Sequence, residues 1–186
     1  MSAGESLSRI IAALDRAGIR YMLTGSFASS YYGIPRASQD IDFVIEADPD
    51  QLRALAAQLT AEKYYFDLAA ALEAHRQPSM FNLLDLESGW KIDFIFRKSR
   101  PFSQEEFRRR TEIVFESTHV FAATAEDVII SKLEWAKLSG SQRQIIDVAT
   151  VLRSRQTALD YAYLEKWIAS LGLQKEWLSA RNAISA

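Results

Sequence analysis

Residues 23–43 read LTGSFASSYYGIPRASQDIDF, and the fold prediction starts from them. The apolar run that ends in Leu23-Thr24 predicts a short buried strand, Gly25-Ser26 predicts a turn, and the residues after it predict a short helix. A loop over residues 34–39 follows, and Asp40 to Glu46 then alternates polar and apolar residues, which predicts a second strand. The order of strand, glycine turn, helix, loop and strand indicates an α/β fold.

Two acidic residues lie two positions apart on the second predicted strand. The side chains of Asp40 and Asp42 therefore share one face of it, where their charges repel each other unless a cation lies between them. Such a pair by itself is also typical of an exposed strand face. The Gly25-Ser26 turn adds a second feature, because backbone N–H groups at a helix N-terminus bind anions, and a side chain at Gly25 would block the approach of a phosphate.

A third acidic residue occurs in the run from Trp90 to Phe96, which predicts an apolar strand. Asp93 is the one acidic residue of that run, and a buried carboxylate needs a partner or a metal. Lys91 or an arginine would supply an ion pair, whereas Asp40 and Asp42 would supply a shared metal site. Since Gly25-Ser26, the acidic pair and Asp93 occur in this order, we expect Asp40, Asp42 and Asp93 to gather around divalent metal held by carboxylates.

The rest of the chain predicts a mixed first part and a helical second part. We expect a catalytic core over residues 1–120 and a helical C-terminal subdomain over residues 121–186. A hairpin is expected over residues 80–96, around Glu87-Ser88-Gly89. Helices are expected over residues 6–17, 49–61, 67–76, 104–110, 124–138, 142–153, 160–170 and 174–183, and edge strands over residues 112–115 and 119–121. Thr124, with Asp127 three residues on, predicts a variant of the capping box at the start of its helix.

Composition restricts the function classes. The 186 residues include no cysteine and two histidines, which argues against thiolate and histidine metal sites. The formal net charge of -2 gives no global sign of nucleic-acid binding. The N-terminal residues do not resemble a signal peptide, and no apolar run approaches the roughly 18 residues that span a bilayer. We therefore expect a soluble, cytoplasmic protein without a membrane partner.

Two stretches resemble a known family. Leu23-Thr24-Gly25-Ser26, followed after thirteen residues by Asp40-Ile41-Asp42-Phe43, resembles the signature of the DNA polymerase beta-like nucleotidyltransferase superfamily. The segment from Tyr32 to Asp40, and that from Thr124 to Leu133 with Arg143 and Asp147 after it, resemble bacterial AbiEii-type toxin nucleotidyltransferases. The resemblance covers about residues 20–150. Ser26 stands where many AbiEii-like chains have a second glycine, although the superfamily allows serine there.

The resemblance implies a minimal nucleotidyltransferase fold with a short, mixed, twisted sheet and packed helices. It implies a transfer from an NTP such as ATP with two Mg²⁺ ions, in which Asp93 also serves as general base. The implied catalytic and metal-binding residues are Asp40, Asp42 and Asp93, and the implied nucleotide-binding residues are Gly25, Ser26, Arg36, Lys132 and Asp147. By spacing alone, a lysine at this position is most often a solvated helix residue, and only the resemblance implies that Lys132 reaches the phosphate site.

The acceptor is not determined by these motifs. AbiEii-like relatives imply a toxin that acts on RNA, with tRNA ends as the first choice and a cognate antitoxin protein as a partner. Other relatives imply a small antibiotic or a protein side chain as acceptor, and a nucleotide-binding or partner-binding module without turnover is a further alternative. A basic cluster is either a solvated face or a guide for RNA phosphates. It consists of Arg97, Lys98, Arg100, Arg108, Arg109 and Arg110.

Overall fold

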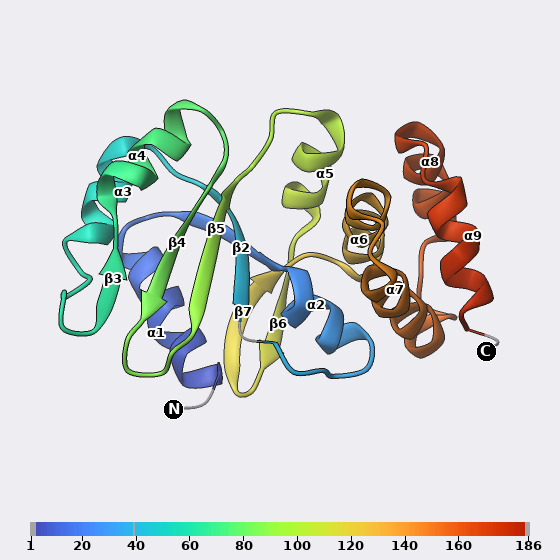
Figure 1. The fold of residues 1–186 in the computed structure, drawn as a ribbon, viewed down its shortest axis with the longest axis horizontal. Helices are drawn as coiled ribbons and strands as arrows, with labels where there is room; N and C mark the ends of the chain where they lie inside the picture. The colour runs from blue at the N-terminus through green and yellow to red at the C-terminus, as the bar shows by residue number, and fades with distance from the viewer. Residues whose placement is uncertain (1–2, 39, 185–186) are drawn as a thin grey trace. The chain divides into compact units, whose positions relative to one another are not determined.

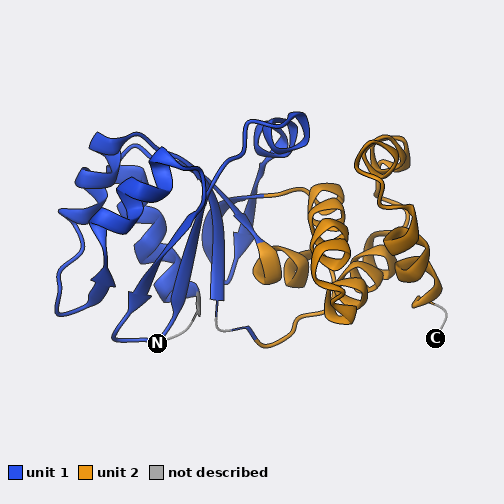
Figure 2. Ribbon diagram, turned by 45° about the horizontal axis from the view of Figure 1, so that its top comes forward, with its two compact units in different colours: residues 1–24, 38–122 blue, residues 25–37, 123–186 orange. Residues whose placement is uncertain are grey.

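A computed structural model describes residues 3–38 and 40–184. Gln39, the last residue of the loop expected over residues 34–39, lies outside the described residues. The chain divides into two compact units, one formed by residues 1–24 and 38–122 and the other by residues 25–37 and 123–186 (Figure 2). The first unit contains the sheet and the second is helical, which confirms the expected α/β class.

The first unit is built on a seven-stranded mixed sheet in the order β3-β4-β5-β2-β1-β7-β6 (Figure 1). Strand β2 pairs in parallel with β5, and β1 pairs in parallel with β7, whereas the other neighbours are antiparallel. The strands are β1 (Arg20–Thr24), β2 (Asp40–Glu46), β3 (Tyr64–Phe66), β4 (Met80–Asp85), β5 (Lys91–Phe96), β6 (Thr111–Phe115) and β7 (Thr118–Ala122).

One expected edge strand lies inside the sheet instead. Strand β7 pairs with β6 on one side and with β1 on the other, where Leu23 is the partner of Ala122. The prediction of an edge position for residues 119–121 is therefore wrong, and β6 is the edge. The cause is a pairing between segments almost one hundred residues apart, which the local sequence pattern does not contain.

Helices cover one face of this sheet and determine which strand residues are buried. They include α1 (Ala3–Arg16), α3 (Pro49–Ala56) and α4 (Leu68–Arg76), while α5 (Pro101–Arg109) follows β5. His75 in α4 packs against Phe96 in β5, and this contact identifies the covered face. Ile41 and Phe43 of β2 point the same way and are fully buried. Asp40, Asp42 and Asp93 consequently belong to the opposite face.

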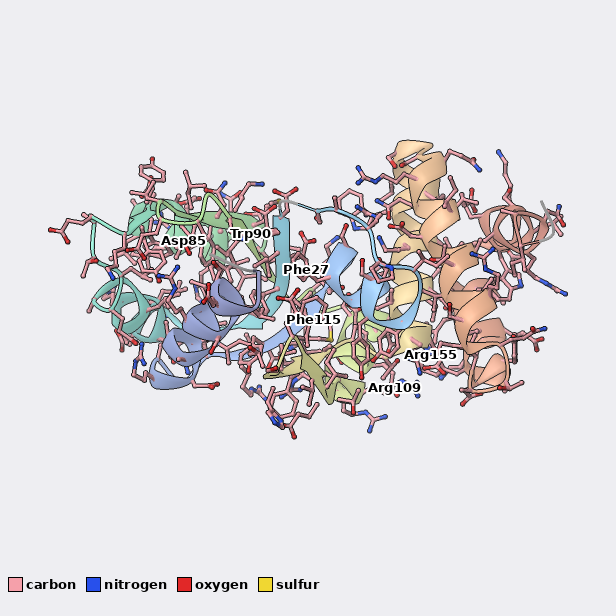
Figure 3. The ribbon with its side chains drawn as sticks, turned by 90° about the horizontal axis from the view of Figure 1, so that it is seen from below. Phe27, Asp85, Trp90, Arg109, Phe115 and Arg155 are labelled. Carbon is pink, nitrogen blue, oxygen red and sulfur yellow. The ribbon has the colours of Figure 1, made fainter. Side chains whose placement is uncertain are left out.

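The β4–β5 hairpin is fastened to α1 by a buried carboxylate. Asp85 accepts hydrogen bonds from Ser6 Oγ at 3.1 Å and from Arg9 at 2.5 Å, and also from the backbone N–H groups of Glu87 and Ser88. Figure 3 shows Asp85 beside this helix. Because Asp85 is buried and fully hydrogen-bonded, it fixes where the turn begins and so the register of β5.

The second unit consists of helices. They are α2 (Gly25–Tyr32), α6 (Ala125–Ser139), α7 (Gln142–Arg155), α8 (Tyr161–Leu171) and α9 (Gln174–Asn182). Thr124 caps α6 by accepting the N–H of Asp127, as the sequence predicts, and Gly140 ends the helix in a left-handed conformation at φ +67°. No helix in the described part of the chain has both the length and the apolar character that crossing a bilayer requires.

Close packing of α2 against α7 depends on a glycine. A Cβ at Gly33 would lie 2.6 Å from Thr150 Oγ1, 3.0 Å from the carbonyl oxygen of Ser29 and 3.1 Å from the backbone nitrogen of Val151. Two of these neighbours are backbone atoms that cannot move aside. The small residue therefore sets the distance between the helix that begins at Gly25 and the helix that contains Asp147.

We expect Gly33→Ala to lower the free energy of unfolding by about 2 kcal/mol, because the added methyl group overpacks this contact. Thermal and urea denaturation of the purified variant would measure the change. The double variant Gly33→Ala/Thr150→Ala should recover part of the loss, since Thr150 Oγ1 is the nearest atom. An unchanged melting temperature in Gly33→Ala would contradict the close approach of α2 and α7.

Candidate functional site

The parallel pairing of β2 with β5 places acidic side chains side by side on the open sheet face. Asp42 is the register partner of Asp93, and Asp40 is the register partner of Lys91. Register partners on adjacent strands point to the same face. The sequence indicated an acidic face on each of the two strands. The structure pairs the strands in a register that places Asp42 directly opposite Asp93.

A polar row continues on both sides of this pair. Thr24 of β1 is the register partner of Asp42, and Asn82 of β4 is the register partner of Asp93. Four neighbouring strands thus contribute Thr24, Asp42, Asp93 and Asn82 in one line. Thr24 and Asn82 were not among the predicted site residues. Asn82 stands in the alternation that exposes Met80, Asn82 and Leu84, so its exposure could be foreseen, but its place beside Asp93 could not.

Lys91 supplies a cation to the carboxylates. Its Nζ lies 2.7 Å from Asp93 Oδ2, and its side chain is 41% exposed, whereas that of Asp93 is 9% exposed. The hydrogen bond to Asp93 raises the pKa of Lys91 against the opposing effect of burial, and the charges of Asp93, Asp40 and Asp42 raise it further. All three aspartates therefore act on one ammonium group.

The donor chemistry of this cluster suits a hard divalent cation. Carboxylate oxygens are the protein ligands that Mg²⁺ prefers. Within the described residues Asp93 Oδ1 is buried and accepts no hydrogen bond, which is costly for a carboxylate oxygen and leaves it able to take a ligand. In the same part of the chain, no three acidic or histidine side chains are close enough together to hold one metal ion. Asp42 and Asp93 are aligned, while Asp40 lies one row along, opposite Lys91.

The second unit contains a cationic cluster around Asp147. Arg36 binds this carboxylate with two hydrogen bonds of 2.9 Å, from Nε to Oδ1 and from a terminal nitrogen to Oδ2. Lys132 Nζ lies 2.7 Å from Asp147 Oδ2 and donates to Gln144 Oε1 at 3.0 Å. Arg36 also donates to Ser26 Oγ at 2.5 Å. The structure thus brings together Ser26, Arg36, Lys132 and Asp147 of the predicted nucleotide-binding set, and adds Gln144.

This cluster has an excess of positive charge at the start of a helix. Burial opposes the ionisation of Asp147, but hydrogen bonds and charges from Arg36 and Lys132 outweigh it and lower the pKa of the carboxyl group. Two cations share that one carboxylate. Gly25 begins α2 at φ +64°, a conformation that favours glycine, and Ser26 follows it. The arrangement can bind an anion through the helix N-terminus, the serine hydroxyl and Arg36.

The basic cluster that the sequence singled out is largely engaged within the first unit. Arg97 is paired with Glu46, and Arg108 forms an ion pair of 2.6 Å with Glu105. Arg110 donates to the carbonyl oxygen of Phe107 and lies over its ring. A count of positive residues therefore overstates the charge that this segment offers to a polyanion.

One known protein family matches most of the chain. The family described as "Nucleotidyl transferase AbiEii toxin, Type IV TA system" matches residues 8–176. No curated protein matches the chain by sequence. The match spans both the carboxylate cluster and the cationic cluster.

Three solved structures share the fold. The antibiotic-resistance factor ANT(2'')-Ia, in complex with adenylyl-2''-tobramycin, is 14% identical in sequence and has a TM-score of 0.61; the match covers 95% of this chain and 99% of that chain. An antigenic nucleotidyltransferase-like protein from Paracoccidioides brasiliensis is 17% identical and has a TM-score of 0.55; the match covers 95% of this chain and 90% of that chain. The lincosamide antibiotic adenylyltransferase LnuA is 13% identical and has a TM-score of 0.54; the match covers 79% of this chain and 94% of that chain. At these identities the likeness shows the nucleotidyltransferase fold.

The charge balance at Asp147 predicts how its removal acts. Asp147→Asn leaves Arg36 and Lys132 without their carboxylate, so the free energy of unfolding at neutral pH should fall by about 3 kcal/mol. Glu165→Gln, at an exposed acid of α8, is the matched control and should change it by less than about 1 kcal/mol. Urea denaturation would measure both.

The same experiment has a defined pH dependence. The pKa of Asp147 is lower in the folded than in the unfolded protein. The ionised carboxylate therefore contributes fully to the free energy of unfolding above the unfolded-state pKa of about 4, and this contribution is lost as the pH falls through the folded-state pKa. The difference in the free energy of unfolding between wild type and Asp147→Asn should therefore shrink on acidification below about pH 4. If the difference in the free energy of unfolding stayed constant or grew in this acidic range, Asp147 would not be ionised in its contacts with Arg36 and Lys132.

Proposed function

Because the chain belongs to the AbiEii family of nucleotidyltransferase toxins, we propose that it transfers a nucleoside monophosphate from an NTP to an acceptor hydroxyl with the help of Mg²⁺. The observation that carries the proposal is the register of β2 and β5, which aligns Asp42 with Asp93 on the open sheet face. Asp40, Asp42 and Asp93 would hold two Mg²⁺ ions. When bound, Mg²⁺ neutralises triphosphate charge and lowers the pKa of the acceptor hydroxyl.

The reaction exchanges a phosphoanhydride bond of the NTP for a phosphate ester of the acceptor. The acceptor oxygen forms a bond to the α-phosphorus, the bond between that phosphorus and the bridging oxygen of the β-phosphate breaks, and pyrophosphate leaves with its electron pair. Asp93 takes the hydroxyl proton as general base. Its buried position beside Asp42 supports this role, because a carboxylate in a partly dry site holds a fixed place and a well-defined direction.

The cationic cluster of the second unit would bind the triphosphate. Gly25 and Ser26 offer backbone N–H groups and a hydroxyl at the N-terminus of α2, and Arg36 offers charge-assisted hydrogen bonds. Asp147 keeps Arg36 and Lys132 in place through the ion pairs at 2.9 and 2.7 Å. Positioned cations of this kind stabilise the charge that develops on the transferred group.

We propose RNA, with tRNA first, as the acceptor of a toxin that acts in the cytoplasm. The family description as the toxin of a toxin–antitoxin system supports a cellular target and a cognate antitoxin partner. The polar row ends at Asn82, beside Asp93 and exposed, which offers both hydrogen-bond donors and an acceptor to an incoming hydroxyl or base edge.

A small-molecule acceptor is the second candidate. The observation in its favour is the engagement of Arg97, Arg108 and Arg110 by partners within their own unit, which lowers the charge available to an RNA backbone. Two structural neighbours are antibiotic adenylyltransferases, and their substrates are a precedent for such chemistry on this fold.

Incubation with each labelled NTP, Mg²⁺ and total tRNA, beside a protein-only control, tests the activity. Label should enter RNA, and Asp42→Asn should reduce incorporation by roughly a thousandfold, since the loss of metal-dependent charge stabilisation costs several kcal/mol. Asp50→Asn, at an exposed aspartate of α3 in the same unit, should retain activity. Equal incorporation by Asp42→Asn and wild type would refute the proposed chemistry.

The salt dependence of binding separates the two acceptors. If RNA phosphates contact the basic cluster, the double variant Lys98→Gln/Arg109→Gln should flatten the slope of log K against log salt for total tRNA by roughly 1.5 units. Filter binding between low and moderate salt gives the slope. A slope near zero in the wild type would exclude an RNA acceptor and favour the small molecule.

A further inference from the structure

Lys91 lies among the three carboxylates, and its ammonium supplies the positive charge that a bound metal ion would supply there. It is opposite Asp40 in register and two residues before Asp93, and its ammonium lies 2.7 Å from Asp93 Oδ2. The same ammonium feels the charges of Asp40 and Asp42. Lys91 is thus the ion-pair partner of Asp93, one of the residues to which the proposed function assigns metal.

We propose that Lys91 is a displaceable counter-cation of the carboxylate cluster: its ammonium holds Asp93 in the metal-free protein and competes with divalent metal for that carboxylate. This inference rests on the proposed function, because it concerns the same three aspartates. Lys91 is a positioning residue in this account, since it acts through Asp93.

The exposure of Lys91 supports displacement. The lysine side chain is 41% exposed, and within the described residues its ion pair is with Asp93 alone, so the flexible stem can turn the ammonium into solvent at little cost. Lys132 provides a contrast within the same chain. Its side chain is 5% exposed and is held by both Asp147 and Gln144, as expected for a cation that stays in place.

Charge balance gives a reason for the competition. Three carboxylates on one face without a cation would destabilise the sheet through repulsion and through the buried position of Asp93. The ammonium reduces the formal charge of the cluster from about −3 to about −2 at neutral pH. A divalent ion that binds Asp93 replaces the Lys91–Asp93 ion pair. Because this ion pair must first be broken, metal binds more weakly than it would to the same carboxylates without Lys91.

Titration of the metal-free protein with Mn²⁺, with free Mn²⁺ measured by electron paramagnetic resonance, tests the competition. Lys91→Met removes the charge and keeps the stem, and should bind Mn²⁺ roughly three- to tenfold more tightly than wild type. Without metal it should also melt at a lower temperature, because Asp93 loses its counter-ion, and Mn²⁺ should raise its melting temperature more than that of wild type. Lys91→Arg keeps the charge and should bind Mn²⁺ no more tightly than wild type.

The matched control is Lys63→Met, which removes another ion-paired lysine of the same unit, 3.6 Å from Glu87. It should leave the Mn²⁺ affinity unchanged. If Lys91→Met melts lower but binds Mn²⁺ with wild-type or weaker affinity, the ion pair is purely structural and the inference is overturned while the proposed function stands. If wild type and Lys91→Met both fail to bind Mn²⁺, with and without a non-hydrolysable NTP analogue, the proposed function fails as well.

Discussion

The parallel pairing of β2 with β5 is the constraint on which the rest of the site depends. It aligns Asp42 with Asp93, and because side chains alternate along a strand, a slip of one residue would turn one of these carboxylates into the helix-covered core. The fully buried Ile41 and Phe43 on the other face make that slip costly. Hydrophobic burial on one face of the sheet therefore sets the spacing of charges on the other.

Each unit balances its buried charge in its own way. In the first unit Lys91 is the partly exposed partner of Asp93 within an acidic cluster, and in the second unit Asp147 is the buried partner of two cations. The acidic cluster suits a metal ion and the cationic cluster suits phosphate, which are the two components that a metal-dependent nucleotidyl transfer must bind. Both clusters lie in the segment that matches the AbiEii family.

The sequence predicted the parts of the fold that depend on local patterns. The alternation of Asp40 to Glu46 and the cap at Thr124 each have a local physical cause, and the structure confirms both. Strand β3 was missed, since Tyr64–Phe66 is three residues long and is ordered mainly by its pairing with β4. The place of β7 and the ion pairs of Arg97 and Arg108 depend on partners that no local pattern specifies. The Lys91–Asp93 pair was one of two sequence hypotheses for Asp93, and the metal site was the other.

Crystals grown with Mn²⁺ and a non-hydrolysable NTP would show, through anomalous scattering at the manganese edge, whether Asp42 and Asp93 bind metal together. We expect an anomalous peak about 2.1 Å from carboxylate oxygens of both Asp42 and Asp93, with the Lys91 ammonium moved away from Asp93. Nucleotide bound without such a peak, or manganese bound only away from Asp42 and Asp93, would contradict the proposed metal site.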